Sequence, residues 1–238
     1  MNYSEIIKNE LNKYSKNEII FASKLYKDTL YNQNVSEMAF YKLLERMHKN
    51  HEIEKLGKGI YYFPKNSKFG RVPLSDDDII SMYTGNKKGM LVGYKLFNKL
   101  KLTTQISKKK VIYSSKVEND TKKIGNVEIK NVQVKYSKEY IKIIEMLEVL
   151  QSFYEIQDIN YKEFFNYAKE FANTYNEETT DEVISKIKYK KSTISFLNNI
   201  LNYFKIENNL DKYLSSLSKY NHASMEEIYE LARTQGWF

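Results

Sequence analysis

The sequence predicts an α+β protein built from three parts. These are an N-terminal winged helix-turn-helix over residues 1–68, a small mixed α/β domain over residues 71–136 and a helical domain over residues 137–238. Three observations predict this order. The first part has the pattern of three short helices and a glycine-tipped hairpin, the second contains short lysine-rich strands, and the third repeats apolar residues at helical spacing.

The N-terminal part begins with a stretch of helical periodicity, "YSEIIKNELNKY", and continues with a short helix in "IIFASKLYKDTL". A third helix is expected in "VSEMAFYKLLERMHKN", where the Ser36 hydroxyl can cap the first turn by accepting a backbone N–H bond. The hairpin follows in "EIEKLGKGIYYFPK". We expect Pro64 to end it, because proline has no N–H to donate to a β-ladder.

The third helix is predicted to bury one face and to expose the other. The buried stripe comprises Phe40, Leu43, Leu44 and Met47. The outward face comprises Met38, Tyr41, Lys42, Glu45 and Lys49, with Glu37 and Arg46 at its borders.

A winged helix places its third helix in the major groove of DNA and its hairpin along the phosphates. The glycines around Lys58 would let the backbone approach DNA closely, and Lys55 and Lys58 could neutralise phosphates. The pattern therefore predicts DNA binding. It leaves open that the winged helix is a protein–protein module, or that the hairpin belongs to another α+β fold.

The middle part is expected to begin with a capped helix, "PLSDDDIISMYTG", in which Ser75 and Asp78 have capping-box spacing. Its three aspartates could suggest a metal site, but carboxylates also favour the first turn of a helix, where the dipole attracts negative charge. A short helix in "GYKLFNKLKL" and strands in "KKKVIYSS", "TKKIGNVEIK" and "VQVKY" are expected next, with a tight turn at Gly125-Asn126. Lysines 108–110 are either a solvated strand start or a second phosphate contact.

From Ser137 onward the apolar spacing predicts a helical bundle. Its buried stripes are expected at Ile141, Ile144, Leu147, Leu150 and Phe153/Tyr154, then at Phe164, Ala168, Phe171 and Tyr175, and then at Ile194, Leu197, Leu201 and Phe204. Ser224 and Glu227 have the spacing of a second capping box. The tyrosines could also belong to a partner interface.

The charge is unevenly distributed along the chain. Residues 1–70 carry 12 basic and 8 acidic side chains, residues 71–135 carry 14 and 6, and residues 136–238 carry 12 and 16. AT-rich codon usage would raise the lysine content but would spread it evenly. The excess of basic residues in 1–135 and of acidic residues in 136–238 therefore favours a polyanionic partner for residues 1–135.

Composition excludes several classes of protein. The chain has no cysteine, which excludes disulfides, iron–sulfur clusters, cysteine-ligated zinc and thiol nucleophiles. No apolar run has the length of a membrane span, and the first residues carry no apolar signal-peptide core. We expect a soluble cytoplasmic protein with no membrane partner.

No motif of an enzyme is present. The sequence has no Walker loop, G-x-G-x-x-G or G-x-S-x-G motif. His48 and His51 lie near a helix end without the spacing of a zinc enzyme motif, and His222 lies in no recognisable catalytic setting. We expect a protein that is not an enzyme and needs neither cofactor nor metal.

One resemblance goes further than these patterns. The stretch "VSEMAFYKLLERMHKNHEIEKLGKGIYYFPK" and the later "PLSDDDI", "GYKLFNKLKLTTQ", "KVIYSSK" and "KKIGNVEIK" resemble, in this order, the AbiEi-like antitoxins of abortive-infection toxin–antitoxin systems. The resemblance covers roughly residues 15–135 and rests on apolar and glycine positions.

The resemblance implies a function. Such proteins bind and repress their own promoter, as inverted repeats of double-stranded DNA, and counteract a nucleotidyltransferase-like toxin, often without a stable complex. It implies DNA-binding residues at Ser36, Glu37, Tyr41, Lys42 and Arg46 in the third helix and at Lys55 and Lys58 in the hairpin. The chain carries less arginine there than the family often does, since only Arg46 could read guanine bidentately. A monomer or a weak dimer is expected.

Overall fold

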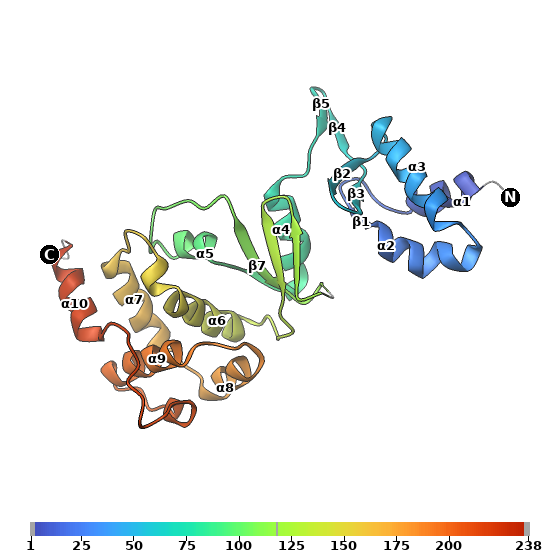
Figure 1. The fold of residues 1–238 in the computed structure, drawn as a ribbon. Helices are drawn as coiled ribbons and strands as arrows, with labels where there is room; N and C mark the ends of the chain where they lie inside the picture. The colour runs from blue at the N-terminus through green and yellow to red at the C-terminus, as the bar shows by residue number, and fades with distance from the viewer. Residues whose placement is uncertain (1–2, 118, 236–238) are drawn as a thin grey trace. The chain divides into compact units, whose positions relative to one another are not determined.

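The computed structural model describes residues 3–117 and 119–235 and combines helices with several small sheets (Figure 1). The mixed class expected from the sequence is thereby confirmed in outline. The chain divides into two compact units, Met1–Ile79 and Ile80–Phe238. The expected division into three domains stays a prediction.

The N-terminal unit follows the predicted order of three helical segments and a hairpin. Its elements are α1 (Tyr3–Leu11), β1 (Ile19–Phe21), α2 (Ala22–Leu25) extended by the turns η1 (Tyr26–Leu30) and η2 (Tyr31–Gln33), α3 (Glu37–Lys49), β2 (Glu54–Gly57) and β3 (Ile60–Tyr62). The apolar triplet before the second helix is strand β1. It pairs antiparallel with β3, which gives a three-stranded sheet of order β1-β3-β2.

One core holds these elements together. Ile7 and Leu11 of α1 and Phe40 and Leu44 of α3 are fully buried, together with Ile20 of β1. The predicted stripe of α3 is therefore buried as expected. Burial of each such side chain stabilises the unit by roughly 1.5–3 kcal/mol.

The prediction that the Ser36 hydroxyl caps α3 is wrong. Ser36 occupies the N-cap position with extended backbone, but its side chain makes no capping hydrogen bond. At the other end, His48 is half-buried, and its Nδ1 lies 3.3 Å from the carbonyl oxygen of Ile53.

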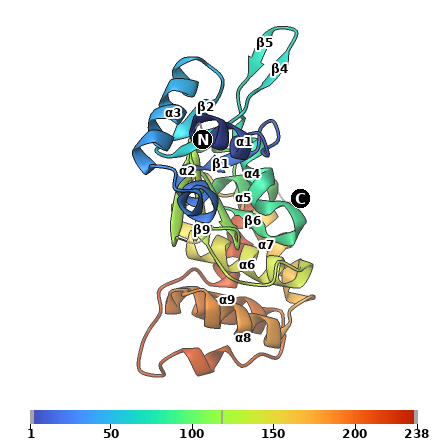
Figure 2. The same ribbon diagram turned by 90° about the vertical axis from the view of Figure 1, so that its right-hand side faces the viewer.

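Two further hairpin strands follow that the sequence did not indicate. The first hairpin ends before Pro64, as expected, and the chain then forms β4 (Lys65–Ser67) and β5 (Gly70–Val72), which pair antiparallel. In Figures 1 and 2 this hairpin projects from the N-terminal unit. Helix α4 (Asp76–Thr84) begins with the predicted box, in which the Asp78 backbone N–H donates to the Ser75 hydroxyl at 3.1 Å.

The second unit contains a four-stranded sheet of order β6-β7-β9-β8. Its strands are β6 (Gly89–Val92), β7 (Lys110–Ser114), β8 (Thr121–Ile124) and β9 (Val127–Asn131), and only the β7–β9 pair among them is parallel. The turn η3 (Gly85–Lys87) precedes β6 and helix α5 (Tyr94–Lys99) follows it. The turn at Gly125-Asn126 joins β8 and β9 as expected. The expected strand "VQVKY" is wrong, because residues 132–136 lie outside the ladder.

Helices form the rest of this unit, as predicted. They are α6 (Lys138–Gln151), α7 (Tyr161–Ala172), α8 (Glu177–Lys186), α9 (Lys191–Tyr203) and α10 (Met225–Thr234), with short turns η4 (Phe153–Glu155) and η5 (Leu210–Tyr213). One core joins them to the sheet: Leu147 and Phe164 belong to the same buried cluster as Val92 and Tyr113. The predicted stripes lie in this core except for Tyr154, which is 69% exposed.

The predicted box of α10 is also confirmed, since Ser224 and Glu227 bond each other's backbone N–H groups. Within the described part of the chain, no helix has the length and apolar character needed to cross a bilayer.

Candidate nucleic-acid interface

The exposed surface of α3 has two flanks and a central strip. Lys42 and Arg46 lie one turn apart on the flank that faces α1. With Tyr3, Ser4 and Ile7 of α1 they line a groove of about 370 Å³. Both cationic side chains are exposed at the mouth of this groove. The flank can therefore offer two adjacent positive charges to an anion.

The opposite flank faces the sheet and is less basic. Tyr41 is half-buried, with its ring 5.3 Å from that of Phe40. Burial raises the pKa of Tyr41, and the Glu37 carboxylate adds to the shift. The phenol therefore stays neutral at pH 7 and can donate a hydrogen bond to a phosphate or a base edge. Glu37 is exposed beside it and would repel a phosphate.

The strip between the flanks carries Met38, Glu45 and Lys49. Met38 is 67% exposed, although it is a large apolar side chain. An apolar side chain at this place could contact a thymine methyl group in a major groove. The strip thus combines an apolar, an acidic and a basic group on the solvent side of the helix.

The β2–β3 hairpin adds two lysines next to this helix. Lys58 lies at the tip between Gly57 and Gly59, and Gly59 has a φ of 69°, which favours glycine. The ammonium of Lys55 lies 5.9 Å from the centre of the Tyr61 ring. Tyr61 is itself buried, and this burial raises the pKa of its phenol, with the Glu45 carboxylate adding to the shift.

The structure therefore brings together part of the predicted set. Lys55 lies over the Tyr61 ring, Lys42 and Arg46 line one groove, and Lys58 lies at the hairpin tip. Ser36 is exposed at the start of α3 with its hydroxyl unused by the helix cap. The contact of any of these residues with DNA stays a prediction.

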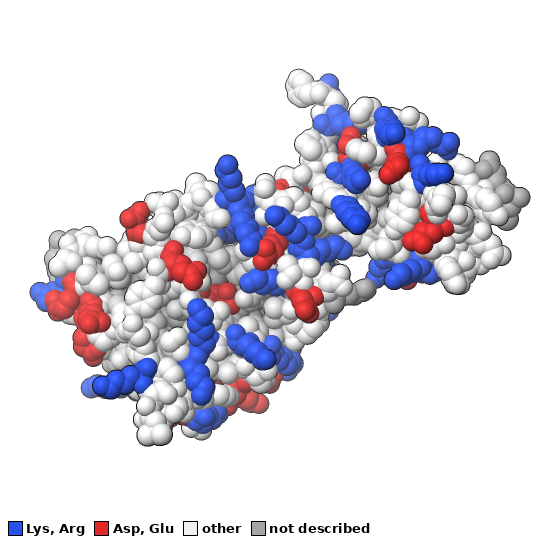
Figure 3. All heavy atoms as spheres, viewed as in Figure 1, with Lys and Arg blue, Asp and Glu red and all other residues white. Residues whose placement is uncertain are grey.

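The cations of this surface are available for a ligand. Within the described residues, Lys42, Arg46, Lys49 and Lys58 form no ion pair. Elsewhere in the N-terminal unit, Lys13 pairs with Glu10 and Arg71 pairs with Glu54. Figure 3 shows lysine and arginine side chains over the N-terminal unit, with a few acidic ones between them.

Sequence reasoning missed the basic hairpin β4–β5, which carries Lys65, Lys68 and Arg71 around the exposed Phe69. The only local signal was the turn-forming composition of "NSKFG", because neither strand shows the apolar alternation of a buried sheet.

The basic run 108–110 lies in the second unit. Lys109 pairs with Glu128 at 2.7 Å, and Lys109 and Lys110 line a hollow of about 660 Å³ with Lys95 and Lys99. Lys99 is itself paired with Glu145 at 3.0 Å. Part of this charge is thus neutralised within the chain.

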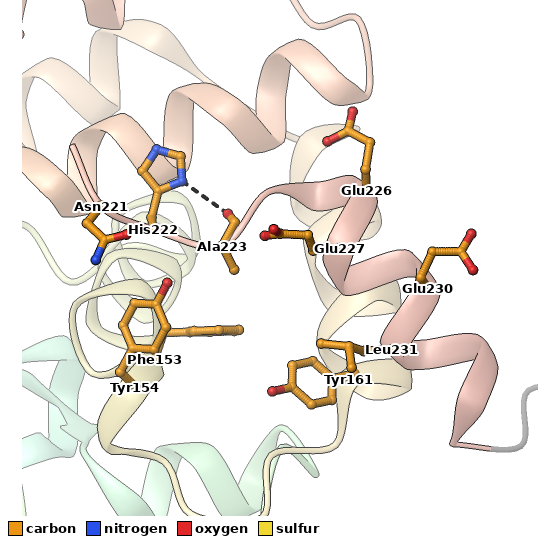
Figure 4. Close-up of a pocket in the computed structure, with 10 residues that line it drawn as sticks. All are labelled: Phe153, Tyr154, Tyr161, Asn221, His222, Ala223, Glu226, Glu227, Glu230 and Leu231. Carbon is orange, nitrogen blue, oxygen red and sulfur yellow. Dashed lines mark hydrogen bonds between the residues drawn. The ribbon is translucent and has the colours of Figure 1, made fainter. Parts of the chain in front are cut away.

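A second hollow, of about 760 Å³, lies between α10 and the start of α7 (Figure 4). Tyr154 and Tyr161 supply aromatic walls, and α10 contributes Glu226, Glu230 and the partly exposed Leu231. Its combination of aromatic rings and carboxylates is suited to a cationic or apolar side chain.

His222 borders this hollow and makes two polar contacts. Its Nδ1 lies 3.0 Å from the carbonyl oxygen of Ala223, as the dashed line in Figure 4 marks, and its Nε2 lies 3.0 Å from the Ser195 hydroxyl. A carbonyl only accepts, so Nδ1 donates to it and a neutral ring accepts from Ser195. A catalytic triad has a carboxylate at the place of this carbonyl. The ring also stacks on Phe196 at 5.1 Å, so we interpret it as an anchor of the loop before α10.

No group of three or more His, Asp or Glu residues suited to a metal ion occurs among the described residues. The aspartate run instead lies in the first turn of α4, where Asp78 forms the capping box with Ser75. Hydrogen bonds from Ser75 hold the pKa of Asp78 below its ordinary value.

Comparison with known proteins identifies a family. The model of a family of unknown function, DUF6088, matches residues 6–163, so the chain belongs to this family. No curated protein matches the chain. Among solved structures, the chain is similar to the Rv2827c protein of Mycobacterium tuberculosis, with 8% identity, a TM-score of 0.43 and coverage of 85% of this chain and 77% of that one.

Proposed function

We propose that the N-terminal unit is a winged helix-turn-helix that binds double-stranded DNA, and that the protein is an antitoxin and autorepressor of a toxin–antitoxin operon. One observation carries the DNA-binding part. Helix α3 exposes Lys42 and Arg46 beside a hairpin that presents Lys58 at its tip.

The dimensions of α3 suit the major groove. Its 13 residues give a rod about 20 Å long, with a diameter of roughly 10–12 Å. The major groove is about 12 Å wide and admits one helix. The short β2–β3 hairpin would then lie along an adjacent phosphate strand, with Lys55 and Lys58 neutralising its charge.

Base reading in this proposal depends on few side chains. Arg46 can form the bidentate contact to guanine, and Met38 can contact a thymine methyl group. Glu37 can accept a hydrogen bond from a cytosine amino group. Most of the affinity would come from phosphates, so binding should fall steeply with salt.

The antitoxin role rests on the resemblance to AbiEi-like proteins. It assigns the promoter of the chain's own operon as the DNA, as inverted repeats, and a nucleotidyltransferase-like toxin as the second target. Neutralisation does not require a stable complex in this proposal. Pairing of winged helices on an inverted repeat needs only a monomer or weak dimer in solution.

A second function is favoured by the hollow beside α10. Its aromatic and acidic lining would suit a basic protein segment, as in a winged-helix interaction module that does not bind DNA. This alternative predicts stable co-purification with one protein and no DNA binding at about 0.1 M salt, where a phosphate-binding protein should still bind.

The proposal is tested in cells with two readouts. A reporter driven by the DNA upstream of the gene measures repression, and co-expression with the neighbouring gene measures neutralisation of toxicity. Arg46→Ala should abolish repression, whereas Lys219→Ala, which removes an exposed lysine of the second unit, should preserve it. Equal repression by both variants would contradict the assigned surface. Unrelieved toxicity from the neighbouring gene would contradict the antitoxin role.

A further inference from the structure

The residues of the β4–β5 hairpin, a two-stranded ribbon, are not required for the folding of either core. Every residue from Lys65 to Val72 is exposed, so the ribbon buries no side chain in either core. Phe69 at its tip is 100% exposed. Single exposed apolar residues are common on proteins, but this one stands at the apex of a projecting ribbon (Figures 1 and 2).

The tip is held in shape by its own contacts. The Ser67 hydroxyl donates to the carbonyl oxygen of Gly70 at 3.0 Å and accepts from the Phe69 N–H at 3.1 Å. Gly70 has a φ of 109°, which a residue with a side chain rarely adopts. These contacts fix the turn that displays Phe69, and a preformed tip loses less entropy on binding.

The base of the ribbon is tied to the rest of the N-terminal unit. The Lys65 N–H donates to the side-chain oxygen of Asn17 at 3.2 Å, and Arg71 pairs with Glu54 of β2 at 3.1 Å. The ribbon is therefore anchored to the same sheet that carries Lys55 and Lys58.

The charge of the ribbon is of one sign. Between residues 65 and 72 it carries Lys65, Lys68 and Arg71 and no acidic side chain. An apolar tip surrounded by cations suits a ligand that has apolar and polyanionic surfaces side by side. The minor groove of DNA has both, because stacked bases lie between two rows of phosphates.

We propose that the β4–β5 hairpin is a second DNA contact, in which Phe69 wedges against a base step in the minor groove and Lys68 contacts a flanking phosphate. This inference rests on the proposed DNA binding and deepens it. Apolar wedges in the minor groove partly unstack a step and kink the duplex. The hairpin would thus bend the DNA beside the groove that α3 reads.

The test uses the full chain and a duplex of about 30 base pairs from the DNA upstream of the gene, long enough for the major-groove site and the neighbouring minor groove. Dyes at its two ends report bending by energy transfer, and anisotropy reports affinity over a salt series. The variants are Phe69→Ala, Phe69→Leu and Lys68→Ala. The matched control is Leu217→Ala, because Leu217 is 96% exposed in the second unit.

The expected results separate the wedge from the charge. Phe69→Ala should weaken binding by about tenfold, as loss of an aromatic contact to bases does, and should abolish the bend with an unchanged salt slope. Phe69→Leu should keep much of the bend. Lys68→Ala should lower the salt slope by about 0.9. Leu217→Ala should match the wild type, and all variants should keep the wild-type Tm, because the exposed side chains support no core.

Three results would overturn the inference. Wild-type affinity and bend in Phe69→Ala would remove the wedge but leave the proposed DNA binding intact. Loss of binding to a protein or to anionic vesicles in Phe69→Ala, with DNA binding unchanged, would assign the tip to that partner. If neither the wild type nor Arg46→Ala binds DNA, both proposals are refuted together.

Discussion

Replacing Lys58 at the hairpin tip should change DNA affinity through charge alone. Lys58 is exposed and forms no ion pair among the described residues, so Lys58→Ala should leave the free energy of unfolding within about 0.5 kcal/mol of the wild type. If Lys42, Lys55 and Lys58 each contact one phosphate, the slope of log affinity against log salt is about −2.7. Removing one contact changes this slope to about −1.8. If the wild type and the variant bind equally well at 1 M salt, the Kd of the variant at 0.1 M salt is then about eightfold higher than that of the wild type.

The assay is fluorescence anisotropy of a labelled duplex from 50 to 300 mM salt, a range over which three phosphate contacts should weaken binding by roughly 100-fold. Lys219→Ala is the control of equal charge change. Lys55→Ala is less clean, since it also removes the contact with Tyr61. Identical slopes for wild type and Lys58→Ala would refute the reasoning that the hairpin tip lies on a phosphate.

Two further substitutions test the packing and the charge balance of the second unit. Gly89→Ala should lower the free energy of unfolding by about 3 kcal/mol, because the new Cβ would meet the backbone oxygen of Tyr113. Gly85→Ala is the control and should change the Tm little, because the space around Gly85 is open. An unchanged Tm in Gly89→Ala would contradict the tight strand packing. Glu148 is buried and accepts a hydrogen bond from Tyr113 at 2.7 Å, and burial raises its pKa above the ordinary value. A raised pKa in the folded state means that stability present at low pH is lost as pH rises through that pKa, so Glu148→Gln should gain stability over wild type between pH 4.5 and pH 7 in urea unfolding. Glu139→Gln, at an exposed position of the same helix, should show no such gain, and parallel pH profiles for the two variants would contradict the assignment.

The predictable part of the fold is the part with long-range periodicity. Helices α3, α6, α7 and α9 each span at least three turns and bury one stripe, so their apolar spacing repeats often enough to be recognised. The capping boxes at Ser75 and Ser224 formed because both partners of each box lie three residues apart on the chain. Their geometry depends on no distant contact.

The unpredicted part depends on partners far along the chain. Strand β1 has three residues, and only its pairing with β3 distinguishes it from the start of a helix. The alternation of apolar and polar residues in "VQVKY" matches the burial of Tyr136. It wrongly implied a strand, because alternation reports which side is buried and not whether a neighbour completes the hydrogen bonds.

The candidate site was predictable to the same extent. The outward face of α3 follows from its periodicity, so Lys42 and Arg46 could be assigned to it. Ser36 has the residue type and position of a cap, but the bond is absent. Phe69 was missed because an apolar residue in a polar turn gives no periodic signal, and its full exposure is a property of the folded hairpin.

The central claim is that the N-terminal unit binds DNA and prefers the DNA upstream of its own gene. The most direct test measures binding of the purified protein to that fragment and to shuffled DNA of equal composition, across a salt series. The account predicts tighter binding to the upstream fragment and log affinity that falls with log salt at a slope of about −2.7 from Lys42, Lys55 and Lys58, or about −3.6 if Lys68 adds its contact. Equal binding to both fragments with a flat salt response would contradict it, and the basic surface of α3 would then require a protein partner.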